Sequence, residues 1–376
     1  MASPHPSDPQ FSQADYAAAL DSLTHDPHTG NNSAPEQDIH TPAEHAVHHQ
    51  WLKKFIPGVE TLAAKYHLGN WVVDRQTGEK RWEGMPAYVR VGMQLLYHGK
   101  EQEKLLSNSH IEAFLKAQSE KQGKAFDSPN QAFEHIEAFV KTYNINCEEL
   151  EHPNIADYQT FNSFFYRKLR PNARPPAHPE DPFVVSSGAD CRLTVFESVD
   201  LAKEFWIKDR NFTTSSLLQD EPLSKSFENG AMAIFRLAPG DYHRYHAPVS
   251  GVVGPTKHIE GQYYTVNPCA VNENLPVFTA NKRDVTLLSM PQEGNVPLDL
   301  AFVQIGAMLV GSIVQTVQTG QQIKRGDEVG YFAYGGSTIV LLVPKDKVKW
   351  DEDLVKNSMN KLETSVKAGE QIGRFV

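Results

Sequence analysis

The segment 334–343 reads Tyr-Gly-Gly-Ser-Thr-Ile-Val-Leu-Leu-Val. Two glycines followed by a β-branched, apolar run are typical of a tight turn that enters a buried strand. Runs of the same kind, separated by turn residues, recur from residue 183 onward. We expect strands at 183–186, 192–196, 231–237, 251–256, 285–288, 300–305, 312–317, 328–333 and 338–343. The sequence therefore predicts a compact β-rich domain over residues 183–376.

One stretch of this domain suggests its architecture. Residues 311–330 read as a strand, a turn at Thr319-Gly320, a second turn at residues 324–327, and another strand. This pattern resembles the hairpins of barrel-sandwich domains, which include lipoyl-type carriers. The resemblance concerns architecture, and it indicates little about function because unrelated activities share such folds.

The chain before the β-rich domain has helical character. A helix start signal with proline at the first helical position occurs at residues 41–44 and recurs at residues 128–131, and a third helix is expected at residues 160–166. The expected fold class is α+β. The predicted order is a disordered segment at 1–40, a mainly helical region at 41–170, a proline-rich linker at 171–182 and the β-rich domain.

The composition limits the partners and the compartment. With 36 Lys and Arg against 46 Asp and Glu, the net charge is -10, which argues against a broad nucleic-acid-binding surface. Three cysteines without a C-x-x-C pair fit a reducing compartment. The sequence has no apolar run of bilayer length and no signal or transit pattern near residue 1. We therefore expect a cytoplasmic protein, with peripheral membrane contact as a further option.

Three segments carry residues suited to catalysis, and the first is Gly336-Ser337. The glycine leaves its acyl carbon unshielded and permits a strained backbone, so the Ser337 hydroxyl is able to attack the Gly336 carbonyl. Acyl transfer to oxygen, elimination and hydrolysis would leave a pyruvoyl group at a new N-terminus. Such a serine needs a base and an oxyanion stabiliser. Taken alone, the segment is equally an ordinary turn before a strand.

The second and third segments offer partners for this serine. Residues 239–248 read Pro-Gly-Asp-Tyr-His-Arg-Tyr-His-Ala-Pro and hold His243 and His246, whose neutral imidazoles suit a general base. Hydrogen-bonded surface histidines explain the pair equally well, and no third metal ligand lies at a familiar spacing, so we expect no metal. Asp190 either satisfies its own turn or orients a histidine in a Ser-His-Asp arrangement.

The chain resembles the phosphatidylserine decarboxylase family from about Phe161 to Lys345. The resemblance rests on spaced blocks that occur in the family's order, which is more specific than any single block. The blocks are 161–169 (Phe-Asn-Ser-Phe-Phe-Tyr-Arg-Lys-Leu), 188–190 (Gly-Ala-Asp), 242–248 (Tyr-His-Arg-Tyr-His-Ala-Pro), 264–268 (Tyr-Thr-Val-Asn-Pro), 278–283 (Phe-Thr-Ala-Asn-Lys-Arg), 306–313 (Gly-Ala-Met-Leu-Val-Gly-Ser-Ile) and 335–338 (Gly-Gly-Ser-Thr).

The resemblance implies a self-processing enzyme with a pyruvoyl cofactor. Ser337 becomes the pyruvoyl group after autocatalytic cleavage of the Gly336-Ser337 bond, which yields chains of residues 1–336 and 337–376. The pyruvoyl ketone then forms a Schiff base with the substrate amine. It accepts the electrons left when carbon dioxide departs, much as pyridoxal phosphate would.

The resemblance also assigns roles to the other residues and exposes two departures. His246, oriented by Asp190, is the base for cleavage, and His243 is the proton donor after decarboxylation. Many family members have leucine where this chain has Gly335, and a glycine is common where it has Cys191. Neither change removes a reacting group, although Cys191 alters the turn or the pocket beside Asp190.

The substrate is the least determined property. The resemblance favours phosphatidylserine, which makes the chain a lyase of phospholipid biosynthesis, and relatives suggest a homodimer of processed αβ units. Some soluble relatives decarboxylate free aromatic amino acids such as tryptophan, and the acidic chain without an anchor keeps this alternative open. Residues 88–97 are the candidate surface for membrane contact, although a helix packed on the domain core explains the same amphipathic pattern.

Two other classes of protein remain as alternatives. A non-catalytic carrier on the barrel-sandwich fold needs a modified lysine at a hairpin tip, where this chain has Gly-Gly-Ser. A zinc hydrolase that uses His243 and His246 would bind stoichiometric metal and stay uncleaved.

Overall fold

The computed structural model describes residues 69–84, 123–124, 126–129, 132–271, 276–291, 296–307, 312–333, 335 and 337–376. The chain divides into two units. The first comprises Met1–Leu68 and Gly84–Ile111, and only Gly84 of it is described. The second comprises Gly69–Glu83 and Glu112–Val376. The expected disordered segment, the first predicted helix and the amphipathic stretch 88–97 therefore lie outside the described residues.

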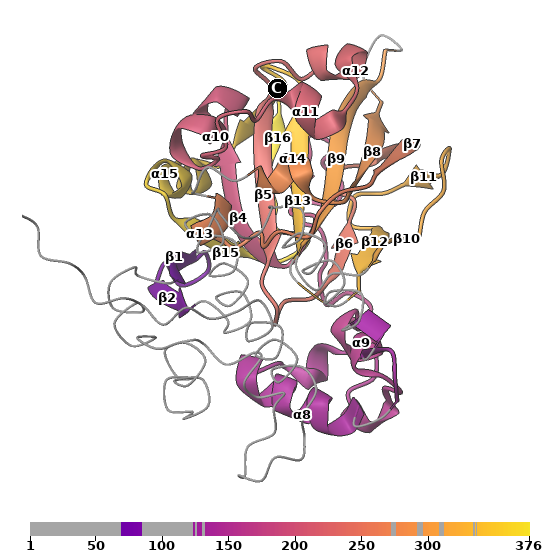
Figure 1. Ribbon diagram of the computed structural model, residues 1–376. Helices are drawn as coiled ribbons and strands as arrows, with labels where there is room; N and C mark the ends of the chain where they lie inside the picture. Colours follow the sequence, from indigo (N-terminus) through magenta and orange to yellow (C-terminus); the bar gives the residue numbers. More distant parts are fainter. Residues whose placement is uncertain are drawn as a thin grey trace, which may run out of the picture. The chain divides into compact units, whose positions relative to one another are not determined.

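A ten-stranded sheet forms the centre of the second unit (Figure 1). Its order is β11-β7-β8-β9-β13-β5-β4-β15-β1-β2; the pairs from β11 to β15 are antiparallel, and β1 pairs with β15 in parallel. The strands are β1 (Gly69–Asp74), β2 (Lys80–Gly84), β4 (Cys191–Phe196), β5 (Ala231–Leu237), β7 (Gly251–Ile259), β8 (Arg283–Met290), β9 (Leu298–Gly306), β11 (Gln322–Ile323), β13 (Ser337–Val343) and β15 (Glu363–Val366).

Two three-stranded sheets add a second β layer. One has the order β10-β12-β6 and the other β14-β16-β3. Their strands are β3 (Val184–Ser186), β6 (Arg244–His246), β10 (Ile313–Gln315), β12 (Glu328–Phe332), β14 (Val348–Trp350) and β16 (Gln371–Phe375). Side chains from these strands, such as Tyr245, Phe332 and Trp350, join one buried cluster with Phe235 and Ile339 of the large sheet. The apolar core therefore lies between the large sheet and the two small ones.

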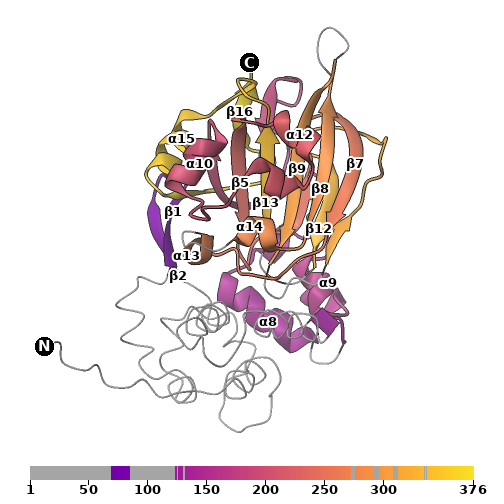
Figure 2. The same ribbon diagram turned by 45° about the horizontal axis from the view of Figure 1, so that its top comes forward.

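Short helices cover the other face of the large sheet, as Figures 1 and 2 show. They are α10 (Val199–Phe205), α11 (Thr214–Leu218), α12 (Glu221–Lys225) and α14 (Val277–Ala280). The remaining described helical elements are α8 (Ala132–Tyr143), α9 (Phe161–Phe165), α13 (Pro268–Val271), α15 (Glu352–Met359) and the 3-10 turns η1 (Cys147–Glu149) and η2 (Ile155–Asp157). In α9, Thr160 and Ser163 form a capping box, which satisfies the amides at the helix start.

The structure confirms the α+β class and the nine predicted strands, with bounds that differ by a few residues. The described sheets form no closed barrel, so the barrel-sandwich likeness is limited to the β10–β12 hairpin region. Residues 69–84 form strands β1 and β2 inside the region predicted to be mainly helical. Their alternation is short, and they become strands because β15 offers an edge to pair with.

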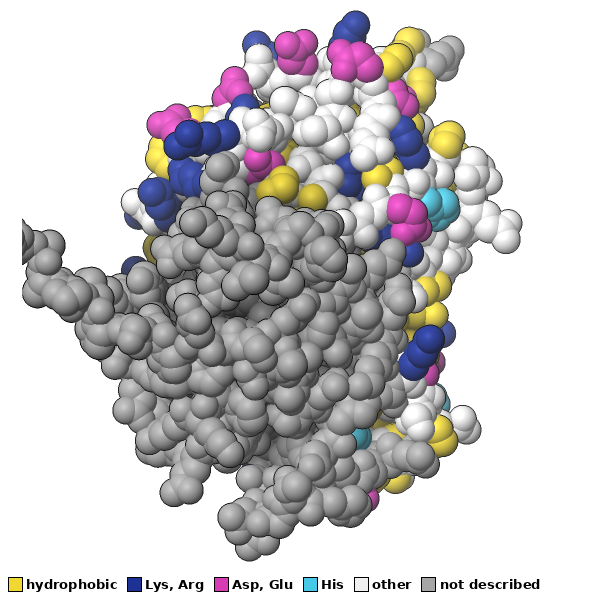
Figure 3. Space-filling view, in the orientation of Figure 1, with side chains coloured by type: hydrophobic (Ala, Val, Ile, Leu, Met, Phe, Trp, Pro, Cys, Tyr) yellow, Lys and Arg dark blue, Asp and Glu magenta, His cyan; other side chains and the backbone are white. Residues whose placement is uncertain are grey.

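The proline-rich residues 171–182 contain no helix or strand, but they are bound to the β-rich domain. Arg174 pairs with Asp190 at 2.8 Å, and Arg325 donates to the carbonyl oxygens of Ala177 and His178 at 2.6 Å. On the described part of the surface in Figure 3, acidic and basic side chains are interspersed. None of the described helices combines the length and apolar character that crossing a bilayer requires.

Candidate active site

Two neighbouring connections run between the large sheet and the β10-β12-β6 sheet. β5 pairs with β13, and β6 pairs with β12. The connection from β5 to β6 ends at His243, and the connection from β12 to β13 ends at Ser337. The amide of Phe332 donates to the carbonyl oxygen of His243 at 3.0 Å. Because both strand pairs hold these ends together, His243 and Ser337 lie at the same crossing between the sheets.

Ser337 is the first residue of β13 and is fully buried. It pairs with Leu237 and Gly306, and alternation along the strand places its side chain on the face of the apolar core. Its Oγ atom has no hydrogen-bond partner among the described residues. A buried hydroxyl without a partner costs about 1–3 kcal/mol, so the position requires a functional explanation.

The backbone before Ser337 is also unusual. Gly335 has a φ of 132°, a conformation that side chains other than glycine rarely adopt. Gly336 lies outside the described residues. The glycines of the quoted motif therefore serve at least one conformational need.

His243 is fully buried, with its ring 3.9 Å from that of Phe165 between centroids. Its Nδ1 atom lies 2.9 Å from the carbonyl oxygen of Asp241, which only accepts, so Nδ1 carries the hydrogen. Its Nε2 atom is buried without a partner among the described residues. Burial lowers the pKa of His243 to about 3, and the charge of Arg167 adds to this effect although the Asp241 bond opposes it. The ring is therefore neutral, with a free lone pair on Nε2.

His246 is partly buried and has partners for both ring nitrogens. Nδ1 donates to the carbonyl oxygen of Gly326 at 2.9 Å, and Nε2 accepts from the Tyr242 hydroxyl at 3.1 Å. Burial lowers the pKa of His246, so this ring is also neutral. Burial raises the pKa of Tyr242, which keeps its hydroxyl protonated and able to donate.

Asp190 is buried and fully engaged with other partners. Its carboxylate accepts from Arg174 at 2.8 and 2.9 Å, from Lys367 at 3.3 Å and from the Ala368 amide at 2.9 Å. Burial would raise the pKa of Asp190, but the Arg174 hydrogen bond and the Lys367 charge hold it below its usual value. Asp190 and His246 share no hydrogen bond, so the structure does not show the direct orienting contact that the resemblance implied.

A link between Asp190 and His246 exists through the backbone and through charge. The His246 amide donates to the carbonyl oxygen of Gly188 at 2.7 Å, two residues before Asp190. The negative charge of Asp190 also opposes the lowering of the His246 pKa. The neighbouring Cys191 thiol is buried, which raises its pKa, and its Sγ atom lies 4.0 Å from the Ser187 hydroxyl.

Sequence reasoning missed three residues that hold the His243 turn. Arg167 is buried and donates to the carbonyl oxygens of Gly240 and Asp241 at 3.0 and 3.1 Å. Arg192 donates to the Asp241 carboxylate at 2.9 Å. A usable signal was present, because Arg192 interrupts the otherwise apolar strand Cys-Arg-Leu-Thr-Val-Phe, and a charge there demands a partner.

Among the described residues, no group of three or more His, Cys, Asp or Glu side chains is arranged to hold a metal ion. The group that the site must accommodate is instead made from Ser337 itself, and the free Oγ atom, the glycine conformation before it and the free Nε2 of His243 fit that need.

Comparison with known proteins agrees with the order of the motifs. The family model described as phosphatidylserine decarboxylase matches residues 161–374. Phosphatidylserine decarboxylase proenzyme 3 of Schizosaccharomyces pombe is 43% identical over 305 residues, which cover 81% of this chain and 31% of that protein. Phosphatidylserine decarboxylase proenzyme 2 of Oryza sativa is 42% identical over 305 residues, which cover 80% of this chain and 48% of that protein.

A bacterial relative matches almost throughout. The phosphatidylserine decarboxylase proenzyme of Fusobacterium nucleatum is 36% identical over 301 residues, which cover 80% of this chain and 96% of that protein. The chain thus spans about a third of the fungal relative, about half of the rice relative and nearly all of the bacterial one. The family match includes both connections at the crossing with Ser337 and His243, and the chain belongs to the phosphatidylserine decarboxylase family.

Proposed function

We propose that this protein is a self-processing lyase that converts phosphatidylserine to phosphatidylethanolamine and carbon dioxide. The observation that carries the proposal is the pair of buried atoms without partners, Ser337 Oγ and His243 Nε2, at one crossing of two sheets. Native proteins rarely leave such atoms unsatisfied unless the site uses them. The relatives are named phosphatidylserine decarboxylases, which favours the phospholipid over a free aromatic amino acid.

The relatives are named as proenzymes, which supports cleavage of this chain at Gly336-Ser337. In this proposal the Ser337 hydroxyl attacks the Gly336 carbonyl, and the serine becomes a pyruvoyl group. That group supplies a ketone that reacts with an amine and accepts the electrons released when carbon dioxide leaves.

His246 is the proposed base for cleavage. Its Nε2 lone pair is already engaged by the Tyr242 hydroxyl, so Tyr242 must give up this bond before Nε2 takes the serine proton. Asp190 acts on His246 through its charge, which favours the protonated ring. Arg174 and Lys367 hold the Asp190 carboxylate in place during this step.

His243 is the proposed proton carrier in decarboxylation. Because its ring is neutral and Nδ1–H is bound to the Asp241 carbonyl, Nε2 must first accept a proton before it can donate one. The substrate ammonium must lose a proton before its amine reacts with a ketone. We propose that His243 Nε2 takes this proton and later returns it to the carbon that has lost carbon dioxide.

Replacement of Ser337 by alanine tests the proposal. The wild-type protein should give a fragment of residues 337–376 on a denaturing gel and by intact mass, with a pyruvoyl-modified first residue. Ser337→Ala should remain one chain and release no carbon dioxide. Ser365→Ala in β15 is the matched control, and it should be cleaved normally. An active wild-type protein that stays in one piece would end the proposal.

The substrate needs a separate measurement. Purified processed enzyme should release carbon dioxide from phosphatidylserine vesicles and none from free tryptophan. Activity on tryptophan alone would replace the phospholipid by the amino acid. A bilayer substrate also implies peripheral membrane contact, and the family resemblance suggests a homodimer of processed units. Flotation with vesicles and sedimentation check these two points.

A further inference from the structure

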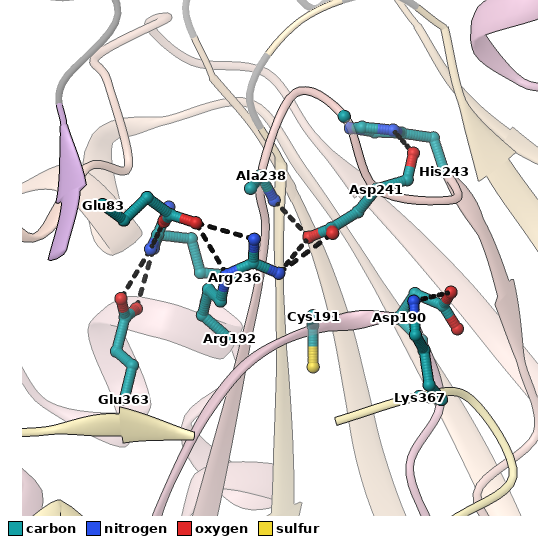
Figure 4. Close-up of polar contacts among 12 residues, drawn as sticks. Glu83, Asp190, Cys191, Arg192, Arg236, Ala238, Asp241, His243, Glu363 and Lys367 are labelled. Carbon is teal, nitrogen blue, oxygen red and sulfur yellow. Dashed lines mark hydrogen bonds and ion pairs between the residues drawn. The ribbon is translucent and has the colours of Figure 1, made fainter. Parts of the chain in front are cut away.

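Five charged side chains form a continuous chain of ion pairs beside the site (Figure 4). In order they are Glu363, Arg236, Glu83, Arg192 and Asp241. They come from β15, β5, β2, β4 and the turn before β6. In the strand register, Arg192 lies opposite Arg236, so both point to the same face of the sheet. Two arginines side by side in this way are stable only when carboxylates separate their charges.

One end of the chain closes the turn that carries His243. The Asp241 carboxylate accepts from Arg192 at 2.9 and 3.0 Å and from the Ala238 amide at 2.8 Å. The Asp241 amide donates back to the Ala238 carbonyl at 2.9 Å. The carbonyl oxygen of the same Asp241 accepts from Nδ1 of His243. Arg192 is thus two contacts away from the imidazole.

The other side of Arg192 is held by Glu83 of strand β2. One Glu83 oxygen accepts from Arg192 Nε at 2.8 Å, and the other accepts from Arg236 at 2.7 Å. Burial would raise the pKa of Glu83, but the two guanidinium charges lower it to about 2. Glu363 holds Arg236 at 2.5 and 2.7 Å.

Such a chain is a poor way to gain stability. Buried ion pairs lose much of their attraction to desolvation, and apolar residues of the same size often stabilise a fold as well. The apolar side chains elsewhere in β4 and β5 show that this sheet accepts them readily. The one contact that an apolar side chain cannot replace is the grip on Asp241.

We propose that Arg192 is a positioning residue for His243, acting through Asp241, and that Glu83 holds Arg192 in place from the β1–β2 hairpin. The inference rests on the proposed decarboxylation, in which His243 Nε2 carries the proton. Fixing the Asp241 carbonyl keeps the hydrogen on Nδ1 and leaves the lone pair on Nε2 at a constant position. The other groups against His243 are the Phe165 ring and the charge of Arg167.

Arg192→Met tests the proposal on the full-length, processed protein. Without the guanidinium, Asp241 loses its main partner, the turn loosens, and water reaches His243. We expect kcat per pyruvoyl group to fall by about 10- to 100-fold, because small misplacement of a catalytic group costs this much, while KM changes little. The pKa of His243 should rise from about 3 towards the ordinary value near 6.5. The pH profile of kcat should then lose activity below about pH 6, where the wild type does not.

Three further variants separate positioning from folding. Asp241→Asn keeps the size of the side chain and should reproduce the change in the pH profile. Arg192→Lys should restore part of kcat, since one ammonium cannot bind both carboxylates as the guanidinium fork does. Glu363→Gln is the matched control: it weakens the far end of the same chain, and its pH profile should stay that of the wild type.

The outcomes distinguish the two proposals. Thermal melting and the yield of the 337–376 fragment report whether each variant folds and is processed. If Arg192→Met is processed and its pH profile is that of the wild type, the inference is wrong. The same conclusion follows if Glu363→Gln shifts the profile as much as Arg192→Met. If Arg192→Met does not fold, Asp241→Asn decides in the same way. A wild-type protein without pyruvoyl or decarboxylase activity would refute the proposed function instead.

Discussion

The turn before His243 depends on a glycine that has no room for a side chain. A Cβ atom on Gly240 would lie 2.7 Å from both Cβ and Cγ of Tyr143, the last residue of α8. Real Cβ atoms do not approach so closely, so either the helix or the turn would have to move. Gly240 is also where Arg167 binds the backbone, at 3.0 Å from the Gly240 carbonyl oxygen. The glycine thus allows α8 and Arg167 to meet the catalytic turn.

Gly240→Ala should therefore lower both stability and decarboxylation. We expect a loss of about 1–3 kcal/mol in the free energy of unfolding, as for other overpacked sites, measured by urea denaturation. Decarboxylation should fall further than cleavage at Ser337, because the displaced turn carries His243. Gly123→Ala is the control, since nothing lies within 4 Å of its added Cβ. Equal stability of the two variants would show that the turn gives way freely.

At the scale of elements, the proposed small chain of residues 337–376 is built into the sheets. β13 lies in the middle of the large sheet between β5 and β9, and β15 lies between β4 and β1. β14 and β16 supply two of the three strands of a small sheet. Trp350 is buried, and its Nε1 atom donates to the carbonyl oxygen of Phe196 at 3.0 Å. Cleavage would cut the chain without releasing the fragment.

We expect the small chain to stay bound to the large one in gel filtration and to separate only in denaturant. Trp350→Ala should weaken this retention by about 3–5 kcal/mol, which is typical for removing a large buried aromatic side chain. The urea concentration at which the fragment is released measures the effect. Lys349→Ala, at a side chain that is 70% exposed, is the control. Loss of the fragment from the wild type in buffer would contradict the expected retention.

At the scale of the whole molecule, the buried imidazoles make the fold sensitive to acid. His243 and His246 both have lowered pKa values, and that of His243 is about 3. An unfolded chain protonates its histidines near pH 6.5, whereas the folded chain keeps His243 neutral far below this. Between these values the unfolded state binds more protons, so folding stability falls as the pH falls.

The free energy of unfolding should therefore decrease by up to about 1.4 kcal/mol per pH unit from His243 alone, between pH 6.5 and pH 3. His243→Asn removes this titration and should flatten the pH dependence. Urea denaturation at pH 7, 6, 5 and 4 measures the slope for both proteins. His152→Asn, at an exposed side chain, is the control. Equal slopes for the wild type and His243→Asn would show that His243 already binds a proton in the folded state.

Local patterns were enough for the strands and for two described helix starts. The β-branched runs predicted nine strands, and the signals at 128–131 and 160–166 preceded α8 and α9. Strands β1, β14 and β15 could not be predicted in this way. They are short, and they pair with chain segments that are distant in sequence, such as Val72 with Glu363. Their conformation is decided by an available sheet edge rather than by their own residues.

The sequence by itself determined the reacting side chains, because Ser337, His243, His246 and Asp190 stand in motifs whose order identifies the family. Only the tertiary structure decided how they are held. It gives Asp190 to Arg174 and Lys367, it leaves Nε2 of His243 free, and it places Arg192 behind Asp241. The reason is physical: a motif records which groups are present, whereas hydrogen-bond partners and burial depend on strands that meet only after the sheets form.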